Sequence, residues 1–169
     1  MEVRLIENKE LLESVELFKI ENLLWGTEKI AKTYGYIGFV QGEGLYIKLV
    51  CEEKDPLRVY KEDQDPVYKD SAMEAFFQFK LKEMIRQMKC SAEIREEQWN
   101  VNLTLPIEIL EQVYGKLNLQ EGSDFRCNFY KICETKEYEH YAAYRCVESE
   151  QPNFHLPEYF EKAVILKRK

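Results

Sequence analysis

The segment Trp99–Leu105 constrains the fold more than any other part of the sequence, because its apolar and polar residues alternate one by one. A period of two is typical of a β-strand that buries one face and leaves the other in a polar environment. We therefore predict a strand here, with one face packed in the core. Its buried face would hold Trp99, Val101, Leu103 and Leu105, and its polar face would hold Asn100, Asn102 and Thr104.

The same alternation recurs elsewhere in the chain. Gly42 and Gly44 mark a turn that would join strands 34–40 and 45–51 into a hairpin. Segments 73–79 and 125–130 also alternate, with apolar faces that begin at Met73 and Phe125. Several short strands separated by Gly, Pro and Asp turns predict an all-β fold, an antiparallel β-sandwich of the immunoglobulin-like or jelly-roll type with one or two short helices.

Two segments depart from this strand pattern. Pro106 ends the pairing of its strand and fits the first turn of a short helix, which Gly115 would cap in a left-handed conformation. Between the predicted strands 73–79 and 99–105, apolar residues of Lys80–Lys89 recur at three- and four-residue steps, which predicts a second helix. No repeat or linker interrupts the sequence, so we expect residues 1–169 to form one domain.

Composition excludes several classes of function. A net charge of −7 and a pI near 5.1 argue against binding to a nucleic-acid backbone. No apolar run reaches the length of a transmembrane helix, so we expect no membrane partner. The N-terminus lacks the apolar stretch of a signal peptide, and the five cysteines form no Cys-x-x-Cys pair. These features favour a cytoplasmic protein with free, buried thiols, with secretion as the alternative. The oligomeric state is left open.

Catalytic and metal sites have little support in the sequence. Only two histidines occur, which excludes a multi-histidine metal site. Asp70 and Glu74 are close in sequence, but an Asp at a strand entrance ordinarily stabilises a turn, so we do not expect a glycosidase pair. We expect no cofactor. An acidic run could bind Ca²⁺, although a solvated turn is the favoured interpretation; it holds Glu62, Asp63, Asp65 and Asp70.

Three segments, in this order, resemble carbohydrate-binding modules of family 9, particularly the stand-alone bacterial domains. They are DPVYKDSAMEAFF (65–77), RCNFYK (126–131) and PNFHLPEYF (152–160). The resemblance runs from about Trp25 to the C-terminus. It implies a β-sandwich that binds a saccharide without catalysis, holding the sugar between two aromatic rings and a strand carboxylate.

The resemblance assigns roles to individual residues. Tyr68 and Phe154 take the positions of the two aromatic rings, and Glu74 takes that of the carboxylate that accepts hydrogen bonds from sugar hydroxyls. Further polar contacts are expected from the strand that carries Tyr130 and from the second aromatic segment. These additional candidates are Arg126, Asn128, Tyr130 and His155.

Each assignment has a structural alternative. Tyr68 could pack over a turn, Glu74 could be solvated or paired with Arg126, and Phe154 could be a buried corner that pins the last strand. The face with Arg126, Asn128 and Tyr130 could be an ordinary polar sheet surface, and His155 a structural histidine. A ring that is exposed favours a ligand, whereas a ring that is buried favours the structural alternative.

One departure from the family weakens the expectation of tight binding. Most family-9-like members carry an additional strand with an Asn-Phe-Glu-Phe-Asn motif, between the carboxylate strand and the strand that corresponds to Trp99–Leu105. Here that interval holds the predicted helix and segment 90–97, in which only Arg95 could replace the missing polar contacts. We therefore keep two alternatives: a diverged domain with weakened binding, and a structural or protein-interaction β-sandwich without a sugar ligand.

Overall fold

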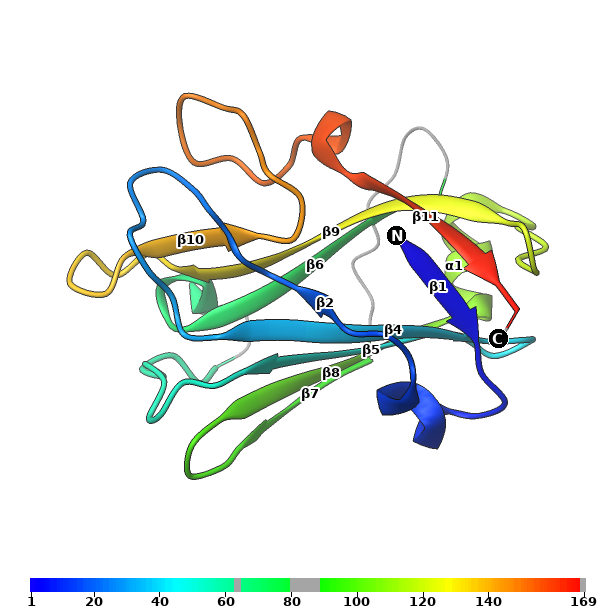
Figure 1. Ribbon diagram of the computed structural model, residues 1–169, viewed down its shortest axis with the longest axis horizontal. Helices are drawn as coiled ribbons and strands as arrows, with labels where there is room; N and C mark the ends of the chain where they lie inside the picture. The colour runs from blue at the N-terminus through cyan, green and yellow to red at the C-terminus, as the bar shows by residue number, and fades with distance from the viewer. Residues whose placement is uncertain (63–64, 80–88, 168–169) are drawn as a thin grey trace.

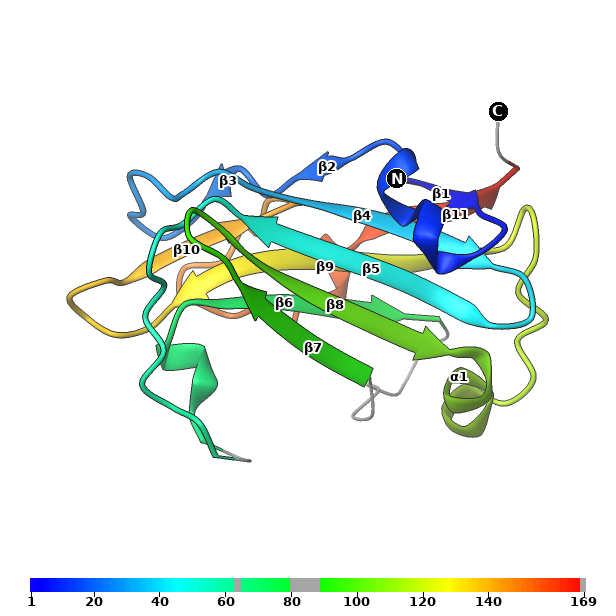
Figure 2. The same ribbon diagram turned by 90° about the horizontal axis from the view of Figure 1, so that it is seen from below.

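The strands form one continuous sheet that folds over on itself into two layers (Figures 1 and 2). A computed structural model describes residues 1–62, 65–79 and 89–167. The strands are β1 (Glu2–Leu5), β2 (Phe18–Lys19), β3 (Asn22–Leu23), β4 (Thr33–Val40), β5 (Gly44–Cys51), β6 (Ala72–Gln78), β7 (Lys89–Ile94), β8 (Trp99–Pro106), β9 (Asp124–Cys133), β10 (His140–Ala143) and β11 (Glu161–Leu166). The helical elements are η1 (Lys9–Ser14), η2 (Val67–Lys69), α1 (Ile107–Tyr114) and η3 (Pro157–Tyr159).

Strand β9 organises the first layer. One of its edges pairs with β6, while the other edge pairs first with β11 and then with β10. The second layer is the antiparallel series β4-β5-β8-β7, with β2 beside β4, and Figure 2 shows it in front of the first layer. Strand β1 joins the layers and is parallel to both β11 and β4. The all-β sandwich prediction is confirmed, and β1 is the departure from a purely antiparallel arrangement.

The core lies between the layers and is built by the alternating faces that the sequence predicts. Met73 and Phe77 of β6 and Phe125 and Phe129 of β9 meet the apolar face of β5, on which Ile47 is 1% exposed. Phe18 enters from β2 and its ring stands 4.4 Å from that of Phe129. Burial of these side chains is the main favourable contribution to folding.

The register predicted for β8 is confirmed on its apolar face, but on its polar face one residue that was predicted to lie outside the core is buried. Trp99, Val101 and Leu103 are all buried in the core. Asn100, predicted outside any buried core, is 1% exposed. It lies on a strand paired on both sides, between Val50 of β5 and Glu93 of β7, and its Oδ1 accepts a hydrogen bond from Asn102 Nδ2 at 2.9 Å.

The two predicted helices have different outcomes. Helix α1 is confirmed, and Gly115 follows it at a positive φ of +70°, although its ψ of −175° is not that of the left-handed cap that was predicted. Most of Lys80–Lys89 lies outside the described residues, but Lys89 itself begins strand β7 and not the end of a helix. The interval before β8 therefore does contain a strand. Alternation could not reveal it because residues 90–94 are all exposed on this sheet edge.

The cysteines, the membrane and metals can be addressed for the described part of the chain. All five cysteines are free, as predicted, and Cys51, Cys127 and Cys133 are buried whereas Cys90 and Cys146 are exposed. No described helix is both long enough and apolar enough to span a bilayer. Among the same residues, no group of three or more His, Cys, Asp or Glu side chains could hold a metal ion.

We predict that Gly44 is the glycine on which the register of β5 and β8 depends. Its φ is +140°, and a Cβ placed there would approach the carbonyl oxygen of Leu105 in β8 to 2.1 Å. Gly44→Ala should therefore lower the free energy of unfolding by about 3 kcal/mol or more, because strain and a backbone clash add together. Urea denaturation measures this change.

Gly42 provides the matched control for this variant. Its φ is +79°, yet a Cβ added to it would have no other atom within 4 Å. Gly42→Ala should cost only the conformational strain, about 1–2 kcal/mol. Equal losses in the two variants would contradict the role given to the Leu105 contact.

Candidate functional site

The candidate site is built on the outer face of the β6–β9 ladder. In the register of this antiparallel pair, Glu74 lies opposite Tyr130 and Phe76 lies opposite Asn128. Because strand side chains alternate, these four point away from the core that contains Phe77 and its neighbours. The polar face of β6 therefore lies where the alternation predicted it, and the same ladder brings Glu74 beside the Asn-Phe-Tyr strand.

An aromatic corner covers part of this face. The segment between β10 and β11, drawn in orange in Figure 1, returns over β9 and places Phe154 against Tyr130, with ring centroids 4.3 Å apart. The Tyr130 hydroxyl donates to the carbonyl oxygen of Phe154 at 3.4 Å. Trp25, from a distant part of the chain, meets Phe154 edge-on at 5.2 Å. We call Trp25, Tyr130, Tyr141 and Phe154 the aromatic corner.

Burial decides the role of Phe154. Its side chain is 7% exposed and that of Tyr130 is fully buried. The prediction that Phe154 is an exposed aromatic platform, facing Tyr68 across an open cleft, is therefore wrong. The structure instead shows the buried corner that was its alternative, because Tyr130 and Trp25 both pack against its ring.

Asn128 and Arg126, both predicted to contact the sugar, already form hydrogen bonds within the protein. Asn128 is fully buried: its Nδ2 donates to the carbonyl oxygen of Arg145, and its Oδ1 accepts from the Arg145 amide, both at 2.9 Å. Arg126 is exposed and donates from Nη1 to the carbonyl oxygen of Phe160 at 3.1 Å. It lies across from Gln78, so the alternative of a cross-strand Glu74–Arg126 pair is wrong.

Glu74 is the chemically distinctive residue of the face. Its side chain is half-buried, and none of the described residues forms a hydrogen bond or ion pair with its carboxylate. Loss of water around the carboxylate, and secondarily the negative charge of Glu134, raise the pKa of Glu74 to about 7. A carboxylate that gives up water without a protein partner is ready to accept hydrogen bonds from a ligand.

Tyr68 lies on the neighbouring turn and is exposed. Its side chain is 42% exposed on η2. The end of β9 holds η2 in place: the Glu134 amide donates to the Tyr68 carbonyl oxygen at 3.1 Å, and Thr135 Oγ1 donates to that of Lys69 at 2.8 Å. Since η2 leads directly into β6, the turn that carries Tyr68 adjoins the strand that carries Glu74.

His155 and Phe76 complete the accessible part of the region. His155 is exposed, and its imidazole meets the Phe76 ring edge-on at 4.9 Å with an interplanar angle of 88°. Phe76 is half-buried and shares the face of Glu74. The sequence prediction did not include Phe76, although its two-residue spacing from Glu74 was the signal that could have identified it.

The acidic run is used mainly by the local backbone. Asp65 Oδ2 accepts hydrogen bonds from the amides of Lys61 and Glu62, and Asp70 Oδ2 accepts one from the Tyr60 amide at 2.9 Å. Asp63 lies outside the described residues. Turn stabilisation accounts for these two aspartates, and the Ca²⁺ prediction remains untested.

Sequence comparison identifies the family of this chain. The profile of Carbohydrate-binding family 9 matches residues 80–165, just over half of the 169 residues. The chain belongs to carbohydrate-binding family 9. This family 9 chain matches no curated protein.

Solved structures share the fold of this family 9 chain. A candidate carbohydrate-binding protein from Bacteroides uniformis ATCC 8492 superposes with a TM-score of 0.79 at 15% identity, covering 98% of each chain. A family 9 module from Caldicellulosiruptor kristjanssonii in complex with cellotriose superposes with a TM-score of 0.66 at 9% identity, covering 100% of this chain and 95% of that one. A family 9 module from the same organism in complex with glucose gives 0.66 at 9% identity and 97% of its length. At these identities the likeness concerns the fold.

We predict that Phe154 and Tyr68 contribute very differently to stability. Phe154→Ala should lower the free energy of unfolding by about 3–5 kcal/mol, because it opens a cavity in the aromatic corner. Tyr68→Ala should change it by no more than about 0.5 kcal/mol, because its ring is largely exposed. Urea denaturation of both variants tests this, and a near-neutral Phe154→Ala would contradict the assignment of the corner.

We further predict that Glu74 makes stability depend on pH. The raised pKa means that folding disfavours the ionised form, so stability falls as pH rises from the unfolded-state value near 4.5 to about 7. Glu74→Gln removes this loss, and its gain over the wild type should grow with pH to about 1–3 kcal/mol at pH 8. Thermal unfolding at pH 5 and pH 8 measures it; a gain that does not depend on pH would refute the shift.

Proposed function

We propose that this chain is a non-catalytic domain that binds a neutral saccharide on the outer face of the β6–β9 ladder, beside η2. The observation that carries the proposal is the Glu74 carboxylate, which is half-buried and has no partner among the described residues. The family resemblance assigns Glu74 to the position of the carboxylate that accepts hydrogen bonds from sugar hydroxyls. The glucose and cellotriose complexes of the structurally similar modules indicate the ligand class to test first.

The chemistry of a sugar fits this surface. Sugar hydroxyls can donate to the Glu74 carboxylate and restore the hydrogen bonds that burial removed, which favours the ionised form. The C–H face of the ring can pack on an exposed aromatic side chain, and Tyr68 provides one at the adjoining turn. Since Phe154 is buried, we propose one aromatic platform in place of the two opposed rings, with Phe76 and His155 beside the carboxylate.

A single platform implies weak binding. A pocket that covers both faces of a ring desolvates it and fixes its hydroxyls together, whereas one exposed ring orients it poorly. We therefore expect dissociation constants for glucose and cellotriose on the order of millimolar. Weak binding corresponds to the first of the two alternatives, a diverged domain that still binds a sugar. We therefore propose this alternative over a structural or protein-interaction domain without a sugar ligand.

The absence of catalysis is part of the proposal. Asp70, the nearest acidic residue in sequence, is buried and bonded to the Tyr60 amide, so it is poorly placed to act as a second catalytic carboxylate. Incubation of the protein with cellotriose should release no glucose. Release that Glu74→Gln abolishes would contradict this part of the proposal.

We predict that two substitutions separate the stacking and hydrogen-bonding contributions. Tyr68→Ala should weaken cellotriose binding about three- to tenfold, the usual contribution of one aromatic contact. Glu74→Gln should weaken it about tenfold or more, because a hydrogen bond to a charged acceptor is lost. Isothermal titration calorimetry or chemical-shift titration at pH 8 measures both effects.

Matched variants control for each change. Tyr68→Phe keeps the ring and should stay within about threefold of the wild type. Glu97→Gln changes an exposed carboxylate that pairs with Lys54 at the β7–β8 turn of the other layer, and should bind as the wild type does. If the wild type binds neither sugar and retains no glycan on an array of neutral oligosaccharides, the proposed function is wrong.

A further inference from the structure

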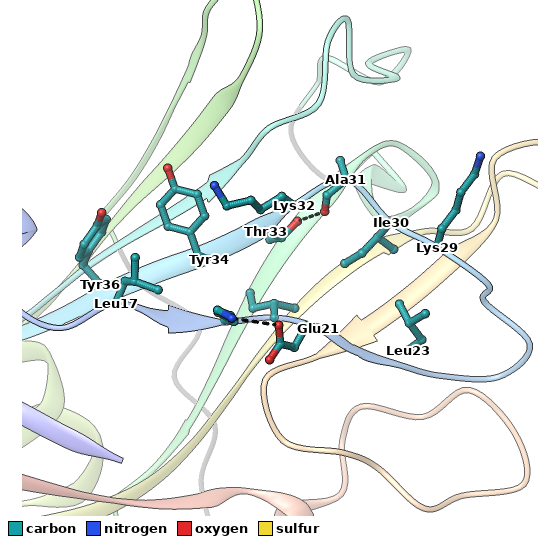
Figure 3. A pocket seen from close by; sticks show the side chains of 12 residues that line it. Leu17, Glu21, Leu23, Lys29, Ile30, Ala31, Lys32, Thr33, Tyr34 and Tyr36 are labelled. Carbon is teal, nitrogen blue, oxygen red and sulfur yellow. Dashed lines mark hydrogen bonds and ion pairs between the residues drawn. The ribbon is translucent and has the colours of Figure 1, made fainter.

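A cavity lies on the other layer, over the outer face of β4 (Figure 3). Its volume is about 550 Å³, within the range of roughly 300–1,000 Å³ that is usual for small-ligand pockets. None of its lining residues belongs to the region around Glu74. We call it the tyrosine–lysine pocket after its principal residues, Tyr34, Tyr36, Lys19, Lys29 and Lys32, which Leu17 joins at one end.

Two tyrosine rings form one wall of this pocket. Tyr34 and Tyr36 are two residues apart on β4, and Figure 3 shows both rings projecting from the same side of the strand. Their centroids are 6.0 Å apart and their planes meet at 84°. Both rings are half-buried, and Leu17 beside them is 42% exposed. Such a pair offers one ring face and one ring edge to the C–H surface of a sugar.

The charges around the pocket are mainly positive, in a chain whose net charge is −7. Three lysines line it against a single acidic residue, Glu21. Lys19 pairs with Glu21 at 3.6 Å and Lys32 pairs with Glu52, while Lys29 forms no ion pair with any described residue. Lys32 Nζ also stands 5.2 Å from the centre of the Tyr34 ring, where Figure 3 shows its side chain extended. The pocket thus joins a stacking surface to cationic groups.

We propose that the tyrosine–lysine pocket is a second binding site, and that it takes an acidic saccharide, an oligosaccharide that contains uronate. Its tyrosines would cover the C–H face of a ring, and its lysines would hold the carboxylate that neutral sugars lack. An acidic peptide fits less well. Strand β4 is hydrogen-bonded to β5 on one edge and to β2 and β1 on the other, so a peptide has no free edge of β4 to join.

The test uses α-1,4-digalacturonate as the probe, followed by calorimetry and by ¹⁵N chemical shifts of the wild-type protein. We expect binding on the order of millimolar, with the largest shifts in residues 17–36. The methyl-esterified disaccharide should bind at least about tenfold more weakly, since it lacks the carboxylate. Raising NaCl from about 50 to 500 mM should weaken binding several-fold, because the attraction is between exposed charges.

Substitutions locate the site and separate it from that of Glu74. Lys29→Gln changes an exposed side chain, so it should leave folding intact while weakening digalacturonate binding about two- to fivefold. Tyr34→Ala should weaken it about tenfold. Lys54 is an exposed lysine that pairs with Glu97 away from the pocket, so Lys54→Gln should leave digalacturonate binding unchanged. Glu74→Gln should also leave digalacturonate binding unchanged, because Glu74 does not line this pocket.

Three results would overturn the assignment. The first is no digalacturonate binding up to about 10 mM. The second is equal binding of the acid and its methyl ester, which would remove the role of the lysines. The third is binding of tetraglutamate as tightly as digalacturonate with no loss in Tyr34→Ala, which would make the pocket a general anion site. If the protein binds digalacturonate but not cellotriose, the proposal for the tyrosine–lysine pocket is supported and the proposed function of the Glu74 region is wrong.

Discussion

The amide of Asn128 fixes a loop that crosses the outer face of β9. This buried side chain needs a partner for its donor and for its acceptor, and the backbone of Arg145, an exposed residue, supplies both. With that segment fixed, Phe154 reaches Tyr130 and closes the aromatic corner. The corner then walls one side of the region in which Glu74 loses water. A residue in the place of a ligand-binding amide thus stabilises the scaffold instead.

The candidate site depends on the loss of water around the Glu74 carboxylate. Glu74 lies opposite Tyr130 on the β6–β9 ladder, and burial removes water from its carboxylate. The protein supplies no compensating hydrogen bond within the described residues, and Glu134 adds repulsion. An uncompensated charge of this kind destabilises the free protein, and it is the type of group that a hydroxyl-rich ligand satisfies. We regard this destabilisation as the basis of the proposed binding.

Alternation in the sequence predicted the inner faces of the sandwich well, because side-chain period and burial are directly related in strands. It placed Glu74 correctly opposite the Met73 face. It could not show what covers an outer face: Asn128 and Tyr130 alternate like solvent-facing residues, yet Arg145 and Phe154, from a later segment of the chain, cover them. The edge strand β7, with its uniformly exposed residues 90–94, carried no alternating burial to detect.

The two aromatic positions show the same limit. The family resemblance placed Tyr68 and Phe154 as equivalent platforms, but only tertiary contacts distinguish an exposed ring from a buried one. Trp25, which packs on Phe154, is far from it in sequence, and no local pattern links the two. Likewise the parallel pairing of β1 with both β11 and β4 depends on how the chain ends meet, and periodicity does not predict it.

The most direct test of this account is the ionisation of Glu74 in solution. Its carboxyl carbon can be followed by ¹³C NMR across a pH titration, with Glu74→Gln to assign the signal, in the free protein and with saturating cellotriose. We predict a pKa of about 7 in the free protein and a lower value with the sugar, because the hydroxyls favour the ionised form. A pKa near 4.5 that cellotriose leaves unchanged would contradict the central claim.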